Sequence, residues 1–368
     1  MRLLSNTDVE QVIDMKETID VLDKAYAAWG DNSALNRPRS DMVEPKAQEN
    51  RAYIFKTMDG LVPEAGVAAV RINSDIIQWY QRNGVTVKDR LPTAKGKRWN
   101  AFMLVFSTET GELIGILPDG VLQKTRVAAT CGLGAKYLAR QDAEVVGLLG
   151  SGWQASAQVL AYCAVRNIKQ IKVFSPTQEN RERFAREMNS QVEAEVVAVS
   201  SAEEAVRQSH IVATVTNAID PVFDADWLEP GSFVTCVKHA ELGEKVFRKM
   251  DAGFINTRET EPLNYIIGQE QQPIRAHDPA VILTGEVAAS ASKATTGITF
   301  DWRGLPELRH VIAGKQLGRT DDKQIVAFIN NIGLGLQFAA VSSVVLKKAE
   351  EQGIGRELPG EWFSSEYQ

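Results

Sequence analysis

Two glycines, at positions 150 and 152, follow the apolar run 145–149 and precede a helical pattern that begins near Ala155. The first glycine permits a tight turn, the second removes a side chain where a pyrophosphate must approach the backbone, and Ala155 lets the helix pack closely on the sheet. The free N–H groups at the helix start favour an anion. The spacing therefore predicts a dinucleotide-binding turn formed by Gly150, Ser151, Gly152, Trp153 and Gln154; the alternative is an ordinary α/β turn without a ligand.

The residue type and the position of Arg126 suggest a binding role, because this arginine lies at the start of an apolar helical segment. A charge in such a place is costly unless it is paired or meets a ligand. The planar guanidinium fork matches a carboxylate. We therefore expect Arg126 to bind a carboxylate, and the alternative is a plain salt bridge.

The elements around the glycine turn alternate regularly between strand and helix. Apolar residues recur at helical spacing after Gly152, and residues 170–174 read as a second strand, so strand, turn, helix and strand fit into about thirty residues. Further strands are predicted at 195–199, 211–216, 232–237 and 252–256, with helices at 178–189, 202–208 and 244–250. This order predicts a Rossmann-type, doubly wound sheet.

The remaining segments predict a second domain of mixed α+β type. A helical pattern runs from Val12 to Trp29, and strands are predicted at 52–58, 67–72, 101–107 and 112–117. The polar and basic stretch 74–98 reads as a long surface excursion, either a lid or interface arm or a solvated insertion without a chemical role. The apolar run from Ile325 to Leu346 reads as a helix that returns to this domain. The predicted division is 1–125 plus 322–368 for substrate binding and dimerisation, with 126–321 as the inserted cofactor domain.

Composition narrows the class of protein. The chain has 368 residues, 44% hydrophobic and 24% charged, and its net charge of −6 includes no basic block, which argues against nucleic acid as a partner. Its cysteines, Cys131, Cys163 and Cys236, lie in apolar segments without metal-ligand spacing, so we expect buried thiols and no metal. No secretory signal and no apolar run of membrane-spanning length is evident, which favours a cytoplasmic protein.

Several segments together resemble the ornithine cyclodeaminase/mu-crystallin family over most of the chain. The first is Leu117-Pro118-Asp119-Gly120 followed by the helix 125–139. The second is the glycine turn, in which a glutamine at the position of Gln154 is typical of the family. Ala313-Gly314, Gly318-Arg319 and the segment 328–333 are similar to the family's returning C-terminal part. The resemblance implies the same discontinuous fold and a homodimer formed by the non-Rossmann domain.

The resemblance also implies roles for three arginines. In the family, the arginine matching Arg126 grips the α-carboxylate of the substrate, and Arg39 aligns with a second substrate-facing arginine, although it also reads as a solvated loop charge. Arg71 stands where the family usually has a lysine. Because arginine hardly ever gives up its proton, we expect Arg71, within the catalytic site, to bind substrate rather than to transfer protons.

A second departure lies after the strand 232–237. Cyclodeaminases of this family have an aspartate there that assists with the substrate amine, whereas this chain reads Val237-Lys238-His239-Ala240-Glu241. Lys238 or His239 is expected to replace it as acid or base, and the alternative is a surface turn with two basic residues. A cation at this place makes ornithine a less suitable substrate.

The end of the second Rossmann strand bears on the choice of cofactor, because an acidic residue there would bind the NAD ribose. The chain instead has Ser175 and Thr177, with Arg181 nearby, which can receive a 2′-phosphate and favours NADP among NAD(P) cofactors. The rest of the cofactor cleft is predicted to be lined by Thr214, Thr216 and Val237, and the resemblance implies that Asn331, which stands where the family often has a serine, lies near the nicotinamide. Ordinary β-branched packing is the alternative for the two threonines.

These features predict an NAD(P)-dependent oxidoreductase that acts on the C–N bond of a small, carboxylate-bearing amino or imino acid, as an imine reductase or an amino-acid dehydrogenase. Two alternatives stay open. One is a cyclodeaminase that releases ammonia, in which Glu241 swings in for the missing aspartate. The other is a binding protein of mu-crystallin type that holds NADPH and a small ligand without turnover.

Overall fold

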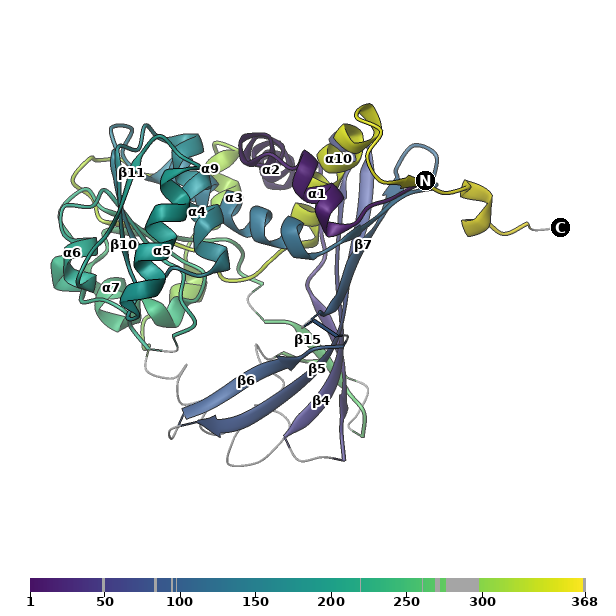
Figure 1. Cartoon of the computed structure of the whole chain (residues 1–368), viewed down its shortest axis with the longest axis horizontal. Helices are drawn as coiled ribbons and strands as arrows, with labels where there is room; N and C mark the ends of the chain where they lie inside the picture. Colours follow the sequence, from purple (N-terminus) through teal and green to yellow (C-terminus); the bar gives the residue numbers. More distant parts are fainter. Residues whose placement is uncertain are drawn as a thin grey trace.

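The structure, a computed structural model, describes residues 1–47, 50–82, 85–93, 95–96, 98–218, 220–259, 261–268, 272–275 and 298–366. It contains a parallel sheet at one end of the molecule and a largely antiparallel sheet at the other (Figure 1). Helices α2 (Met15–Gly30) and α3 (Gly120–Leu138) lie between the two sheets and contact each other.

Within the described residues, the parallel sheet has seven strands, and every neighbouring pair runs parallel. Their order is β11 (Glu195–Ala198), β10 (Gln170–Phe174), β9 (Val145–Leu149), β12 (Ile211–Thr214), β13 (Phe233–Cys236), β17 (Val326–Ile329) and β14 (Ala252–Ile255). The chain order reverses at β9, which pairs with β10 on one side and β12 on the other. This confirms the predicted Rossmann-type sheet, and ligands of such sheets bind beside the carboxyl ends of the strands at this reversal.

The connecting helices match the predicted pattern. They are α4 (Trp153–Val165), α5 (Gln178–Asn189), α6 (Ala202–Val206) and α7 (Gly243–Lys249). In α4, the small residues Ala155, Ala157 and Ala161 are buried, and the helix packs against α3. The turn before α4 is therefore held between the sheet and α3.

The second sheet is largely antiparallel, and eleven of its strands lie within the described residues. The order of strands along the main path is β16 (Ile274–Arg275), β15 (Leu263–Ile266), β3 (Ser40–Pro45), β4 (Arg51–Val62), β5 (Val67–Arg82), β7 (Asn100–Ser107), β8 (Leu113–Pro118), β1 (Arg2–Leu3) and β18 (Arg356–Glu357). Two strands lie off this path: β2 (Leu35–Asn36) pairs with β4, and β6 (Val85–Leu91) pairs with β5. Helix α10 (Gly335–Glu351) packs on β4 and β5, and α1 (Asn6–Val12) and α2 pack on α10.

The stretch 74–98 is not the long surface excursion that its polarity predicts. Residues 74–82 continue β5 and pair with β6, so the segment starts as a β-hairpin that extends the sheet. Trp79 and Ile77 are buried with Ile54 in a small core of their own. The prediction was wrong because the inward positions of this hairpin also include charged side chains, which hide the alternation of apolar and polar residues.

The predicted C-terminal helix from Ile325 to Leu346 was wrong over its first part. Residues 326–329 form β17, which lies between β13 and β14 in the parallel sheet, and only α10 is helical. Conversely, β15 and β16 come from the stretch predicted as cofactor domain but pair with the antiparallel sheet, through β3. Strands on both sides of the predicted boundary at 321/322 therefore pair with the sheet of the other predicted domain, and the boundary at 125/126 falls inside α3.

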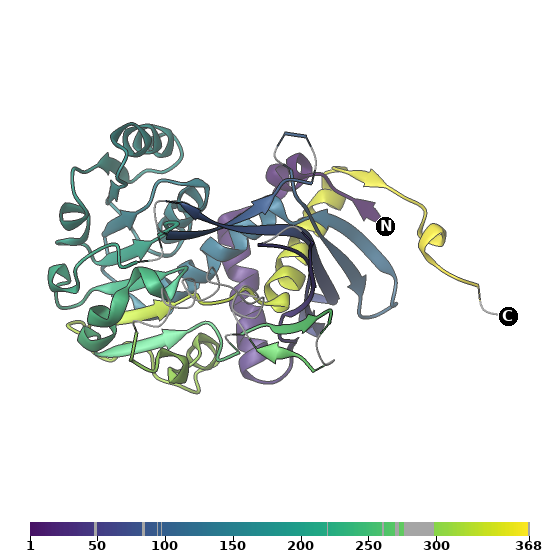
Figure 2. The same ribbon diagram turned by 90° about the horizontal axis from the view of Figure 1, so that it is seen from below.

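The termini lie beside the antiparallel sheet, where β18 pairs with β1, and the last described residues extend away from the body (Figure 2). The three cysteines carry free thiols, with Cys131 and Cys236 buried and Cys163 partly so. In the described part of the chain, we find no helix that is both long and apolar enough to cross a membrane.

Candidate functional site

The glycine turn lies at the carboxyl end of β9 and has room for a ligand. Gly150 has φ +123, its N–H donates to Phe174 O at 2.8 Å, and a Cβ on it would lie 2.4 Å from Val215 O. Gly152 is the N-cap of α4, has no side-chain cap, and a Cβ on it would meet nothing within 4 Å. Backbone N–H groups at a helix start beside open space suit a phosphate, so the turn fits a dinucleotide.

The neighbouring residues predicted to contact the cofactor lie at the same edge. Ser151 and Ser175 are joined by a hydrogen bond of 2.9 Å, and the guanidinium of Arg181 donates to Ser175 O at 2.9 Å. Thr177 is the N-cap of α5 and makes no side-chain cap. Two hydroxyl residues and one cation are thus gathered at the end of β10.

The side chain of Trp153 is exposed, whereas the side chain of Gln154 bonds to the neighbouring helix α3. Trp153 is 58% exposed, and the ammonium of Lys124 lies 5.5 Å from the centre of its ring. The amide of Gln154 donates to Lys124 O at 2.9 Å, so it ties α4 to α3. In this structure, Gln154 therefore links the glycine turn to the helix that carries Arg126.

The hydroxyl groups of Thr214 and Thr216 donate hydrogen bonds to the carboxylate of Glu241 and do not face open space. Glu241 is fully buried in η3 (His239–Glu241), and it accepts hydrogen bonds from Thr214 Oγ1 at 3.1 Å and from Thr216 N at 2.7 Å and Oγ1 at 2.5 Å. Burial raises the pKa of this carboxyl. The bonds hold Glu241 behind the rim, which disfavours its swinging in for the missing aspartate.

Two further predicted cofactor residues lie on the rim. Val237 follows β13 directly and is partly buried. Asn331 follows β17, donates from its amide to Thr257 O at 2.9 Å and accepts from Thr257 N at 3.3 Å. Asn331 therefore joins the ends of β17 and β14.

Arg126 lies in α3, is 4% exposed, and keeps its charge without a carboxylate partner among the described residues. Its Nη1 donates to Gln337 Oε1 at 2.9 Å and its Nη2 to Gln123 Oε1 at 2.7 Å, while its Nε is buried and finds no acceptor within the described part of the chain. Burial and the nearby Arg71 lower the pKa of Arg126 to about 10, so it is a cation at neutral pH. A buried cation with an unused donor suits an anionic ligand.

Arg126 also lies beside the rim of the parallel sheet. A Cβ on Gly333, just after β17, would lie 2.5 Å from the Nη2 atom of Arg126. Asn330, in the same segment, donates to Val127 O at 3.1 Å. The predicted carboxylate-binding group and the predicted nucleotide edge are therefore adjacent.

Arg71 is brought next to Arg126 but has a carboxylate of its own. Its Nε and Nη2 donate to the two oxygens of Asp119 at 2.9 and 2.6 Å. The guanidinium centres of Arg71 and Arg126 lie 4.9 and 4.8 Å from the ring centre of Phe338. The ring faces both cations, and such contacts are favourable in a desolvated place.

Arg39 forms a bidentate ion pair with the fully buried Asp41, with Nε donating at 2.8 Å to Oδ1. It precedes β3 by one residue, and the β3–β4 register places it opposite Met58, which in turn lies opposite Arg71. Side chains directly opposed across antiparallel strands share a face. Arg39 and Arg71 thus lie on the same face, two strands apart, and Arg39 is not a solvated loop charge.

Lys238 and His239 follow β13 at the rim. Lys238 is exposed, and His239 stacks on Trp302 with ring centres 4.4 Å apart. Neither packs against Arg71 or Arg126 in any described contact. The structure therefore places both basic residues at the nucleotide edge and leaves their role in proton transfer a prediction.

A buried polar network behind Arg126 has no counterpart in the predicted site. Gln337 donates to Tyr26 Oη and to Thr130 Oγ1, both at 2.7 Å, and Tyr26 donates to Asn256 Oδ1 at 2.5 Å. Asn256 follows β14, so the network joins α10 and α2 to the parallel sheet. Gln337 and Asp119 could have been suspected only as polar residues inside or beside apolar helices.

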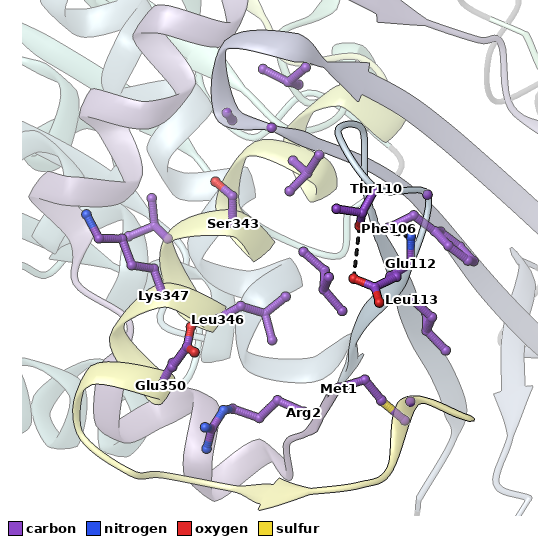
Figure 3. Close-up of a pocket in the computed structure, with 18 of the residues that line it drawn as sticks. Met1, Arg2, Phe106, Thr110, Glu112, Leu113, Ser343, Leu346, Lys347 and Glu350 are labelled. Atoms are coloured by element: carbon purple, nitrogen blue, oxygen red, sulfur yellow. Dashed lines mark hydrogen bonds between the residues drawn. The ribbon is translucent and has the colours of Figure 1, made fainter. Parts of the chain in front are cut away.

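A pocket of about 1320 Å³ lies elsewhere, between the outer side of α10 and the β7–β8 turn (Figure 3). Ser343, Lys347 and Glu350 of α10 line one side of it, and Thr110 and Glu112, which are joined by a hydrogen bond of 3.0 Å, line the other. None of the predicted site residues lines it. It is therefore separate from the arginine pair and the glycine turn.

The sequence profile of the ornithine cyclodeaminase/mu-crystallin family matches residues 2–353. The chain belongs to this family, as the resemblance predicts.

Relatives in the family include a Delta(1)-pyrroline-2-carboxylate reductase of Bacillus thuringiensis subsp. konkukian, 26% identical over 78% of this chain and 83% of its own length. An alanine dehydrogenase of Archaeoglobus fulgidus is 25% identical and covers 97% of both chains. Among solved structures, the Delta(1)-pyrroline-2-carboxylate reductase of Thermococcus litoralis in complex with NADH and L-proline matches with a TM-score of 0.73 at 25% identity, over 97% of this chain and 100% of that chain.

Proposed function

We propose that this protein is an NAD(P)-dependent oxidoreductase that acts on the C–N bond of a small amino or imino acid. The observation that carries the proposal is Arg126, a buried guanidinium without a carboxylate partner in the described chain, adjacent to the rim of a dinucleotide-type sheet. The names of the relatives point the same way, since they are imine reductases and an amino-acid dehydrogenase.

In this proposal, the substrate carboxylate binds Arg126 through its unused Nε and an Nη group, and Arg71, which is held by Asp119, lies beside it. The glycine turn and the end of β10 would hold the nucleotide, which supplies or accepts a hydride when bound. Phe338 keeps water from the guanidinium faces, which strengthens their attraction for an anion.

The proton on the substrate nitrogen needs an acid or base, and we assign it to Lys238 or His239 at the end of β13. Imine reduction or amino-acid dehydrogenation fits this site better than cyclodeamination. The reason is that Glu241, the remaining acidic candidate to replace the missing aspartate, is held by Thr214 and Thr216.

For the cofactor, we propose a preference for NADP within the NAD(P) class. The end of β10 offers Ser175, Thr177 and the cation of Arg181. A 2′-phosphate would accept hydrogen bonds from the hydroxyls and the guanidinium. The Thermococcus relative is in complex with NADH, and a comparison of KM for NADPH and for NADH tests the preference of this chain.

We also propose a homodimer that covers the outer face of the antiparallel sheet. This face, opposite to the one that carries Arg71, presents the exposed apolar side chains of Met42, Phe102 and Tyr265. Met42 and Tyr265 lie directly opposite each other in the β3–β15 register. An apolar sheet face of this kind is typical of an interface, and analytical ultracentrifugation tests it.

The proposed activity is tested by following the absorbance of the nicotinamide with a panel of substrates: 2-oxo acids with ammonia or methylamine, cyclic imino acids, and L-amino acids in the reverse direction. We expect turnover with at least one carboxylate-bearing substrate and none with the matching amine or imine that lacks the carboxylate. Ammonia release without net change in the nucleotide would instead identify a cyclodeaminase. Tight binding of NADPH and a ligand in calorimetry, without reaction in either direction, would identify a binding protein.

A further inference from the structure

Glu241 is a buried acidic residue at the carboxyl ends of β12 and β13. Its carboxylate is bonded to three neutral donors, the hydroxyl of Thr214 and the hydroxyl and N–H of Thr216, and no cation among the described residues lies within ion-pair distance of it. Burial raises the pKa of this carboxyl, whereas the three donors favour its ionised form. A buried charge that lacks a cationic partner costs free energy, so its presence calls for an explanation.

The contacts of Glu241 do not require a charge. A glutamine of the same shape could accept from both groups of Thr216 through its oxygen, and its N–H group could donate to the Thr214 hydroxyl, which accepts as well as donates. The fold would therefore be served equally well by a neutral side chain. Ionisable groups that are kept at a cost to stability are found preferentially at functional sites.

Glu241 lies behind the part of the rim that the nicotinamide half of a dinucleotide would use. The glycine turn follows β9, and the hydroxyl residues with Arg181 lie at the end of β10, on one side of β9. On the other side, β9 pairs with β12, and β12 pairs with β13. Since a dinucleotide crosses the reversal in strand order with its pyrophosphate at the turn, an adenosine half at β10 leaves the nicotinamide half at β12 and β13.

The loop that Glu241 holds is in contact with the glycine turn. Val215 N donates to Leu149 O at 2.9 Å, and a Cβ on Gly150 would lie 2.4 Å from Val215 O and 3.5 Å from Cγ2 of Thr216. Thr216 therefore lies between the carboxylate and the turn. The field of a buried charge is only weakly screened by water, so it extends through one such residue.

We propose that Glu241 supplies a buried negative charge that favours the oxidised, cationic form of the bound nicotinamide over the reduced, neutral form. Glu241 acts from behind the rim and touches neither cofactor nor substrate. Loss of a hydride leaves the nicotinamide ring with a positive charge, which a nearby fixed anion stabilises. A reduced nucleotide bound here is then a stronger hydride donor, which favours reduction of an imine. This inference rests on the proposed function for the binding and the placement of the nucleotide.

Nucleotide binding tests the inference independently of turnover. Calorimetry would give Kd for the oxidised and the reduced form of the cofactor, NADP or NAD, that the wild type binds more tightly. In Glu241→Gln, we expect Kd of the oxidised form to rise by about tenfold and Kd of the reduced form to stay within about twofold. The melting temperature without nucleotide is expected to stay the same or to rise, because the amide keeps the shape and removes a buried charge.

Glu229→Gln is the matched control. Glu229 lies before β13, toward the opposite ends of the same strands, and it accepts a hydrogen bond of 3.2 Å from Gln208 N. This substitution removes the same unit charge from the same domain and keeps an acceptor oxygen. We therefore expect the ratio of the two dissociation constants in Glu229→Gln to equal that of the wild type.

A ratio in Glu241→Gln that equals the wild-type ratio would overturn the inference. A melting temperature lower by more than about 5 °C would also overturn it, because Glu241 would then be a structural residue. Either result, with turnover of an imino or amino acid intact, would leave the proposed function in place. Failure of the wild type to bind either form of the nucleotide would refute both proposals. A shifted ratio without turnover of any substrate would support the inference and refute the oxidoreductase.

Discussion

The side-chain oxygen of Gln337 accepts a hydrogen bond of 2.9 Å from the guanidinium of Arg126. The same oxygen accepts from Leu334 N at 3.0 Å, and the amide nitrogen donates to Tyr26 and Thr130. Gln337 is fully buried, so each of these bonds is made away from water. A neutral residue thus fixes the orientation of Arg126 without cancelling its charge, which leaves the cation available to a ligand.

Gln337 is therefore expected to be a positioning residue. Gln337→Glu keeps the shape but gives Arg126 a carboxylate inside the protein, and it removes the N–H groups that donate to the hydroxyls of Tyr26 and Thr130. We expect KM for the carboxylate substrate to rise by about tenfold to a hundredfold, with a smaller change in kcat and unchanged nucleotide binding. A merely structural role would instead lower the melting temperature and leave KM in the folded fraction as it is.

Arg126→Ala separates the two binding sites. Because it removes the buried cation and not the glycine turn, kcat/KM should fall by about a hundredfold to a thousandfold, while calorimetry still detects nucleotide binding. Arg126→Lys should recover only part of the activity, since an ammonium lacks the planar fork. Unchanged kinetics in Arg126→Ala would contradict the carboxylate role.

The sequence predicts the parallel sheet well because its strands are short, apolar and separated by helices with a clear period. β17 is the exception, since Val326–Ile329 are buried on both faces and a continuous apolar run beside an apolar helix does not distinguish strand from helix. The β5–β6 hairpin was missed because its inward positions include Asp75 and Arg90, which stabilise it as an ion pair.

The residues of the site likewise divide into those that the sequence predicts and those that it does not. The glycine turn and Arg126 could be found because their residue types are tied to a chemistry. Asp119 and Gln337 could not, because their importance lies in the partner that the fold brings to them across many residues of sequence. Thr214 and Thr216 were predicted to line the cofactor cleft, and only the structure shows that Glu241 occupies their hydroxyls.

The glycines of the turn are expected to fail in different ways. The Cβ of Gly152→Val would meet no protein atom within 4 Å, so the melting temperature should stay within a degree or two while nucleotide affinity is lost. Gly150→Ala forces a side chain into a positive φ and against Val215 O, so the free energy of unfolding should fall by about 1–3 kcal/mol or more. Thermal melts with and without nucleotide check both. Intact nucleotide binding in Gly152→Val would exclude the turn as the pyrophosphate site.

Arg181 tests the choice of cofactor. Arg181→Ala removes the guanidinium that donates to Ser175 O at the end of β10. KM for NADPH should rise by about tenfold, as for the loss of one charge-assisted hydrogen bond, whereas KM for NADH should change little. Arg183→Ala, on an exposed position of the same helix, is the matched control. Equal effects on both nucleotides would argue against a 2′-phosphate site here.

The most direct test of the account is a crystal structure of the protein with nucleotide and a non-reactive carboxylate analogue of the substrate. We predict the pyrophosphate at the N–H groups that follow Gly150, and one carboxylate within hydrogen-bond distance of the Nε and an Nη atom of Arg126. A carboxylate held elsewhere, with Arg126 still bonded only to Gln123 and Gln337, would contradict the central claim.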